Sequence, residues 1–156
     1  MNVKELMTRP AKSCGLESSL EQIASIMKDY DCGIIPIIKE DRTLAGIITD
    51  RDICLATAAL HQKPSDIKVQ NVLGGKVYTC SSEDDVDAAL AKMHDYKVRR
   101  LPVVDEKQRL IGIISMNDIL LGLPRWKGEQ SQALSSAKII NAFQAICSHG
   151  HAIAAA

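Results

Sequence analysis

The sequence predicts an α/β fold: two copies of one helix–strand–strand–helix unit, packed sheet to sheet about a pseudo-twofold axis, and a final C-terminal helix. The first observation behind this prediction is an internal repeat, because residues 46–53 (Gly-Ile-Ile-Thr-Asp-Arg-Asp-Ile) return 66 positions later as residues 112–119 (Gly-Ile-Ile-Ser-Met-Asn-Asp-Ile). The same shift aligns residues 3–56 with residues 69–122 without a gap. The second observation is that both copies pass from helical to β-strand spacing of apolar residues in the same order. A tandem duplication accounts for both observations.

Each copy is expected to begin with an amphipathic helix. Apolar residues fall at i, i+3, i+4 and i+7, which places them on one helical face. In the first copy they are Leu20, Ile23, Ala24 and Met27, and in the second they are Val86, Ala89, Leu90 and Met93. Each helix therefore has one apolar face to bury against the rest of its unit.

Two short strands are expected to follow each of these helices. Residues 34–38 and 101–104 are runs of apolar, mostly β-branched residues that contain a proline, which favours a strand start or a sheet edge. After a charged turn, residues 44–48 and 110–114 supply the second strand of each copy. A sheet this small cannot bury both of its faces alone, so the two units are predicted to pack sheet to sheet.

The repeat also predicts how the chain is divided. We assign residues 1–60 to the first copy, 61–68 to a linker, 69–123 to the second copy, and 124–156 to a connector, a C-terminal helix and a tail. The helix is indicated by apolar residues at helical spacing, namely Ile139, Ala142, Phe143 and Ile146. Its apolar face has to be covered by its own domain, by a second copy of the chain or by an outside protein. The sequence leaves these three coverings open.

Charge and hydropathy exclude several classes of function. Lysine and arginine together number 19, as do aspartate and glutamate, so the formal net charge is zero. A protein that grips a nucleic-acid backbone is usually basic, and we therefore expect no nucleic-acid partner. The sequence has neither an apolar run of the roughly 18 residues that span a bilayer nor a secretory leader, which predicts a cytoplasmic protein without a membrane partner. Phosphate-binding glycine loops and nucleophile–base arrangements are also missing from the sequence, so we expect no enzyme activity.

Polar residues of functional interest lie where the second strand of each copy meets the next helix. There, Thr49 precedes Asp52 by three residues, and Ser115 precedes Asp118 by three. This spacing is that of a capping box, in which the hydroxyl caps the helix and the acid lies in its first turn. The same geometry can hold a nucleotide, because unpaired helix N–H groups favour phosphate and a carboxylate can accept both ribose hydroxyls. From the residues alone, both interpretations stay open.

Three groups of residues carry a resemblance to a known family. They are Leu-Met-Thr at positions 6–8, the two proline-containing strands, and the repeated Gly-Ile-Ile-Thr/Ser-x-x-Asp element. The chain resembles a pair of cystathionine-β-synthase (CBS) domains, also called a Bateman module, of the small stand-alone bacterial type. The resemblance covers roughly residues 1–123, and the second copy departs from it at residues 73–75, where Leu-Gly-Gly replaces Met-Thr-x. It implies a homodimer, and it implies that the start of the chain crosses to the other unit.

The resemblance also implies a ligand and a site. The ligand would be an adenosine-containing nucleotide such as AMP, ADP, ATP, S-adenosylmethionine or NAD, bound in clefts between the units as a regulatory ligand rather than as a resident cofactor. Asp52 and Asp118 would bind the ribose, and Thr49 and Ser115 would contact the ribose or the α-phosphate. The base is expected in an apolar slot at the proline strands and just before the first helix of each copy. The residues implied there are Ile34, Ile35, Leu101 and the segments 14–19 and 80–85.

Two arginines make the two copies unequal. Arg99 and Arg100 precede the proline strand of the second copy, where the first copy has Gly33 and Ile34. Guanidinium groups suit phosphate oxygens, so Arg99 and Arg100 are expected to contact phosphate, with Arg51 as a further contact. The alternative is a solvated basic edge.

Two other functions stay open. One is a structural or protein-interaction module with vestigial pockets, which would dock a partner through the helix around residues 139–146. The other is a metal- or redox-responsive protein, because the chain has five cysteines and its tail holds Cys147, His149 and His151. The wide spacing of the cysteines and the lack of Cys-x-x-Cys favour small core residues in a reducing compartment. No metal site is therefore predicted.

Overall fold

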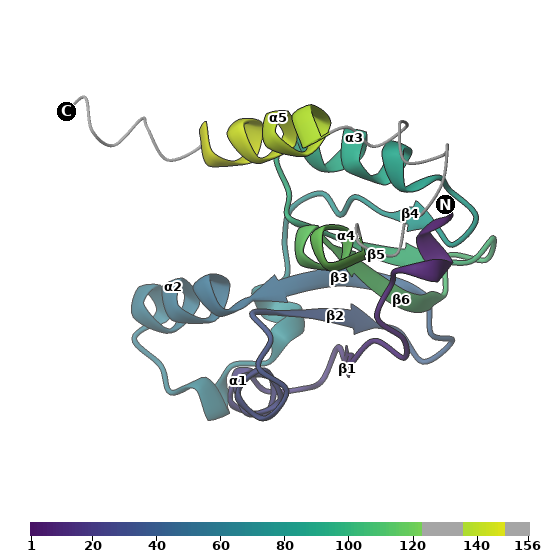
Figure 1. The fold of residues 1–156 in the computed structure, drawn as a ribbon. Helices are drawn as coiled ribbons and strands as arrows, with labels where there is room; N and C mark the ends of the chain where they lie inside the picture. The colour runs from purple at the N-terminus through teal and green to yellow at the C-terminus, as the bar shows by residue number, and fades with distance from the viewer. Residues whose placement is uncertain (123–135, 149–156) are drawn as a thin grey trace. The chain divides into compact units, whose positions relative to one another are not determined.

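The computed structural model describes residues 1–122 and 136–148, which contain five α-helices and two three-stranded sheets (Figure 1). This arrangement confirms the α/β class predicted from the sequence. The chain divides into two compact units. The first unit consists of Pro10–Val77 and Glu106–Leu110, and the second of Met1–Arg9, Tyr78–Asp105 and Ile111–Ala156.

The first unit is built on a sheet with the strand order β1-β2-β3. Its elements are β1 (Cys14–Gly15), α1 (Leu20–Asp29), β2 (Ile34–Ile38), β3 (Leu44–Thr49), α2 (Asp50–Leu60) and the short 3-10 helices η2 (Pro64–Asp66) and η3 (Val69–Asn71). Strands β2 and β3 are antiparallel with Ile34 opposite Thr49, and β1 is parallel to β2. The predicted apolar face of α1 is confirmed, because Leu20, Ile23 and Met27 are buried in one core with the sheet residues Ile35, Ile37 and Ile48.

The second unit repeats this plan with the strand order β4-β5-β6. Its elements are η1 (Val3–Glu5), β4 (Cys80–Ser81), α3 (Val86–Tyr96), β5 (Arg100–Val104), β6 (Leu110–Ser115), α4 (Met116–Gly122) and α5 (Ser136–Cys147), and only the first residue of β6, Leu110, is grouped with the first unit. All four residues of the predicted apolar face of α3 are buried. They share a core with Leu101 and Val103 of β5 and with Ile114 of β6.

Each sheet contains a third strand that the sequence pattern did not predict. Strands β1 and β4 have two residues each, and they pair in parallel with β2 and β5 through Cys14 opposite Ile37 and Cys80 opposite Val103. Two residues are too few to show an alternating pattern, so these strands are defined only by their pairing partners.

Each unit contains the first segment of the other sequence copy. Val3 is fully buried in the core of the second unit, and its N–H donates to the carbonyl oxygen of Asp84 at 2.9 Å. At the equivalent position, Val69 is fully buried in the core of the first unit and donates to the carbonyl oxygen of Ser18, also at 2.9 Å. The crossing implied by the family resemblance is therefore present. The segment just before β1 completes the core of the second unit, and the segment just before β4 completes the core of the first unit.

Two glycines make room for these exchanged segments. A Cβ atom on Gly112 of β6 would lie 2.8 Å from Met7 Sδ and 3.0 Å from the Thr8 carbonyl oxygen. A Cβ atom on Gly46 of β3 would lie 2.7 Å from the side chain of Leu73. The glycine that begins each Gly-Ile-Ile element is therefore explained by close packing, because any side chain there would displace the segment lying over the strand.

The C-terminal helix α5 packs against α3 of its own unit. Ile139, Ala142 and Ile146 are buried in the second unit's core, and Lys138 Nζ forms an ion pair with Asp87 Oδ2 of α3 at 2.8 Å. Figure 1 shows α5 running along α3. Of the three coverings that the sequence left open for this face, the structure therefore shows the first. Within the described parts of the chain, no helix is long and apolar enough to cross a membrane.

Candidate functional site

The first candidate site lies where β3 ends and α2 begins. Thr49 has extended backbone angles and caps α2, accepting the N–H of Asp52 on its hydroxyl oxygen at 3.1 Å. In return, Asp52 Oδ2 accepts the backbone N–H of Thr49 at 2.8 Å and its hydroxyl at 2.7 Å. The predicted capping box is therefore fully formed. We refer to this pair as the Thr49/Asp52 corner.

The second unit contains the same arrangement where β6 meets α4. Asp118 Oδ2 accepts the backbone N–H of Ser115 at 2.7 Å and its hydroxyl at 2.6 Å, and the Asp118 N–H donates to Ser115 Oγ at 3.2 Å. Asp118 is half-buried, whereas Asp52 is exposed. We refer to this pair as the Ser115/Asp118 corner.

In both corners the capping bonds use only one oxygen of the carboxylate. The hydrogen bonds that the Asp52 and Asp118 side chains accept all end on Oδ2, and Oδ1 of neither residue has a hydrogen-bond partner within the described part of the chain. A carboxylate has about four acceptor positions, so each aspartate retains acceptor capacity after capping its helix. Capping and ligand binding are therefore compatible uses of the same side chain.

The residue that follows each capping residue is held by a main-chain bond to the residue just before the neighbouring strand. The N–H of Asp50 donates to the carbonyl oxygen of Gly33 at 3.3 Å, and the N–H of Met116 donates to that of Arg99 at 3.0 Å. The structure thus places Ile34, opposite Thr49, beside the first corner and the backbone of Arg99 beside the second.

The other predicted site residues differ in how far they are exposed. Ile34 is 9% exposed, while Ile35 and Leu101 are completely buried in the cores of the first and second units. Arg100 is half-buried at the start of β5, and Arg99 and Arg51 are exposed. The sequence analysis did not predict the two segments that lie over the strands beside these corners, around Thr8 in the second unit and around Leu73 in the first. The departure from the family pattern at residues 73–75 (Leu-Gly-Gly) was the one sequence signal of the latter segment.

Comparison with known proteins decides the family. The profile described as "CBS domain" matches this chain twice, over residues 3–58 and 69–125. The chain belongs to the CBS domain family.

Several CBS proteins resemble this one along most of the CBS pair. The uncharacterized protein YlbB of Bacillus subtilis (strain 168) is 35% identical over 120 residues, which cover 76% of this chain and 80% of that protein. The crystal structure of Hypoxic Response Protein I with two coordinated zinc ions is 28% identical with a TM-score of 0.71, covering 78% of this chain and 98% of that one. The CBS domain pair of protein MJ0100, in complex with 5-methylthioadenosine and S-adenosyl-L-methionine, is 28% identical with a TM-score of 0.68 and the same coverage.

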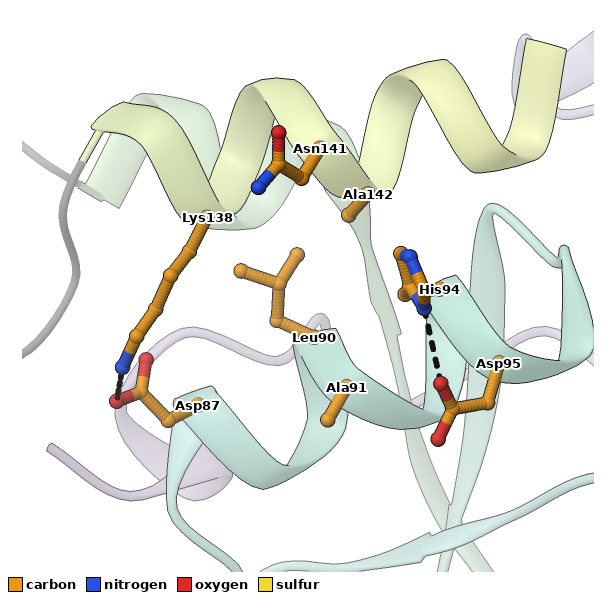
Figure 2. Close-up of a pocket in the computed structure, with 8 residues that line it drawn as sticks. All are labelled: Asp87, Leu90, Ala91, His94, Asp95, Lys138, Asn141 and Ala142. Atoms are coloured by element: carbon orange, nitrogen blue, oxygen red, sulfur yellow. Dashed lines mark hydrogen bonds and ion pairs between the residues drawn. The ribbon is translucent and has the colours of Figure 1, made fainter. Parts of the chain in front are cut away.

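Helix α5 lies beyond the residues matched by the CBS profile, and a hollow of about 300 Å³ lies between α5 and α3. Figure 2 shows Lys138 reaching from α5 to Asp87, with Leu90 beside them, while His94 contacts Asp95. The lining residues are Asp87, Leu90, Ala91, His94, Asp95, Lys138, Asn141 and Ala142, and none of them is a residue predicted to bind the nucleotide.

A wider hollow of about 700 Å³ lies in the first unit. Three of its lining residues, Cys14, Gly15 and Ser18, belong to the segment 14–19 that was expected beside the base. The rest of its wall comes from Ser13 and from the α1 residues Glu21, Gln22, Ser25 and Ile26. This part of the predicted segment therefore faces open space.

The metal or redox alternative depends on cysteine, histidine and carboxylate side chains. Residues 1–122 and 136–148 contain no group of three or more His, Cys, Asp and Glu side chains placed to hold a metal ion. His149 and His151, the tail histidines of the metal alternative, lie outside the described residues. Burial raises the pKa of the Cys80 thiol to about 12 and also raises the pKa of Cys14. Both thiols are therefore protonated, and poor nucleophiles, near neutral pH.

Thiol titration tests which cysteines are accessible and reactive in the folded protein. With a disulfide reagent such as DTNB at pH 8, the exposed Cys54 and Cys147 are expected to react within minutes, whereas Cys14 and Cys80 should react only after unfolding in urea. The double variant Cys54→Ser/Cys147→Ser should remove the fast phase. Rapid native-state labelling of Cys80 in that variant would show that this thiol is accessible and would reopen a redox role.

Proposed function

We propose that this CBS protein is a non-catalytic regulatory module that binds an adenosine-containing nucleotide at the Thr49/Asp52 and Ser115/Asp118 corners. One observation carries the proposal: both corners present an aspartate whose Oδ2 is fixed by the capping box and whose Oδ1 has no partner within the described residues. An oriented acceptor of this kind suits the two hydroxyls of a ribose. The MJ0100 CBS pair, solved with two adenosine compounds, supports the choice of ligand.

The remaining predicted residues complete the proposed site. Thr49 and Ser115 would contact the ribose or α-phosphate. The apolar residues Ile34, Ile35 and Leu101 would hold β2 and β5 in position beside the base. Arg99 and Arg100, with Arg51, would neutralise phosphate, since guanidinium groups donate two parallel hydrogen bonds to phosphate oxygens.

A nucleotide regulates by differential affinity. If it binds one arrangement of the protein more tightly than another, its binding shifts the population toward that arrangement. The new surface, or a changed homodimer, would then signal to a partner protein. The buried face of α5 does not support docking through residues 139–146, because that face already covers α3.

Thermal unfolding with a nucleotide panel tests the proposal. The panel contains AMP, ADP, ATP, S-adenosylmethionine and NAD. A ligand at a hundredfold excess over its Kd adds about 2.7 kcal/mol, which corresponds to roughly 5–10 °C in Tm for a chain of this size. The 2′-deoxy form of the best nucleotide should give a smaller shift, because one hydroxyl bond is lost. Light scattering of the same samples measures the molecular mass and shows whether the nucleotide changes the proportion of homodimer. An unchanged Tm with every nucleotide would refute the proposal.

A further inference from the structure

We propose that residues 73–75 form a strap that closes over the free edge of β3 when a nucleotide occupies the Thr49/Asp52 corner. This inference rests on the proposed function and adds to it a conformational response in one unit only.

In the second unit the corresponding strap is already closed. The N–H of Thr8 donates to the carbonyl oxygen of Ile113 at 2.9 Å, and the N–H of Ile113 donates to that of Thr8 at 3.1 Å. The two residues form an isolated antiparallel bridge on the outer side of β6. Ile113 lies two residues before Ser115, so the bridge borders the Ser115/Asp118 corner.

In the first unit the same place is open. By the 66-residue shift, Ile47 corresponds to Ile113 and Gly74 to Thr8. The described part of the chain contains a bridge between Thr8 and Ile113 but none between Gly74 and Ile47.

The register of β2 and β3 shows which way Ile47 directs its backbone groups. Gly33 accepts the N–H of Asp50, and in antiparallel strands bonded and non-bonded pairs alternate. Ile47 is opposite Pro36, which falls on a non-bonded position and has no N–H to donate. The N–H and C=O of Ile47 therefore face the free edge of β3, as those of Ile113 do in β6.

The strap has an anchor and a hinge. Leu73 packs directly on Gly46 of β3, which keeps the segment beside the strand. The next two residues, Gly74 and Gly75, are exposed, and a Cβ atom added to either would have no neighbour within 4 Å. Gly75 has a φ of +84°, a conformation that glycine adopts readily and can leave readily. In the second unit the same two positions are Thr8 and Arg9, which are conformationally more restricted.

A nucleotide would favour closure because it removes water from the corner. Without a ligand, the N–H and C=O of Ile47 can bond to solvent. A ligand that lies in the corner and displaces this water without covering the edge itself would leave them unsatisfied, and pairing with Gly74 would restore both bonds. The Thr49/Asp52 corner is thus an induced site and the Ser115/Asp118 corner a preformed one.

Amide exchange measured by NMR, with S-adenosylmethionine and AMP as probes, tests the strap. Without nucleotide, the amide protons of Ile47 and Gly74 should exchange at least about tenfold faster than those of Ile113 and Thr8, since only the latter are bonded. At saturating probe, the Ile47 and Gly74 amides should become protected. Gly74→Pro removes the N–H that would donate to the Ile47 carbonyl and leaves only one bond of the bridge, so the probe-dependent protection of the Ile47 amide should be reduced while the Ile113 amide is unchanged.

Three results would overturn the proposal, and calorimetry on the same samples separates them. Equal protection of Ile47 and Ile113 without nucleotide would show that the strap is already closed. Heat of binding with unchanged exchange at Ile47 and Gly74 would show a site without a strap. Absence of binding for every nucleotide would refute the proposed function and nucleotide-driven closure together.

Discussion

Replacing Asp118 with asparagine is expected to weaken nucleotide binding at the Ser115/Asp118 corner by about 10- to 100-fold while leaving the helix cap largely in place. Asp118 Oδ2 accepts the hydroxyl and the N–H of Ser115 at 2.6 and 2.7 Å. Asparagine can keep its one carbonyl oxygen in that position, but its other group is an NH₂, which cannot accept a ribose hydroxyl. Calorimetric titration with S-adenosylmethionine and AMP measures the loss.

The loss of nucleotide affinity is expected to differ between the two aspartates because they differ in solvent exposure. Asp118 is half-buried and Asp52 is exposed, so water competes more strongly for hydrogen bonds at Asp52. Asp52→Asn is therefore expected to reduce binding at its own corner by a smaller factor than Asp118→Asn.

Glu5→Gln is the matched control for both variants. Glu5 Oε1 accepts the N–H of Asn2 at 2.8 Å in the capping box of η1, so the variant makes the same acid-to-amide change at a cap in the second unit. It should bind nucleotide with native affinity. Native affinity in Asp118→Asn, or an equal loss of affinity in Glu5→Gln, would contradict the role of Asp118 in binding ribose.

The parts of the fold that the sequence predicted are those with a local pattern. The apolar stripe of α3 spans several turns, and the strand runs are bounded by charged turns, so each element can be recognised from its own residues. The exchange of Val3 and Val69 between units has no local pattern, because a single buried valine does not indicate which core it enters. The family resemblance implied this crossing, and hydrophobic periodicity could not. Likewise, the apolar face of α5 was predicted, but the surface that it covers was not.

At the candidate site, the sequence predicted the corners better than their surroundings. Thr49 and Asp52 are three residues apart, so local geometry alone brings their side chains together. The direction taken by a long exposed side chain such as Arg99 depends on the ligand and solvent around it, which no sequence pattern specifies. The open strap at Gly74 depends on pairing with a strand distant in sequence, and for this reason it became visible only in the structure.

Deleting residues 1–9 is expected to destabilise the protein by on the order of 5 kcal/mol, with the effect concentrated in the second unit. The deletion removes the buried side chain of Val3 and the backbone bonds that Val3, Lys4 and Thr8 make with that unit. Such a loss is comparable to the whole stability of many domains, about 5–15 kcal/mol. Urea unfolding measures the total, and amide exchange in α3 and β5 against α1 and β2 shows which unit opens.

Two matched point variants separate this exchange of segments from a general loss of stability. Val3 and Val69 are the same residue at equivalent positions, and both are fully buried. Truncating either to alanine should cost about 2 kcal/mol, or roughly a 30-fold increase in exchange through local opening. Val3→Ala should accelerate exchange in α3 and β5, and Val69→Ala should accelerate it in α1 and β2. Val3, which lies just before β1 in the chain, would then stabilise the sheet β4-β5-β6. Val69, which lies just before β4, would stabilise the sheet β1-β2-β3. If instead each variant loosened both units equally, the protein would unfold as one cooperative body, and the exchanged segments would join the units rather than complete separate cores.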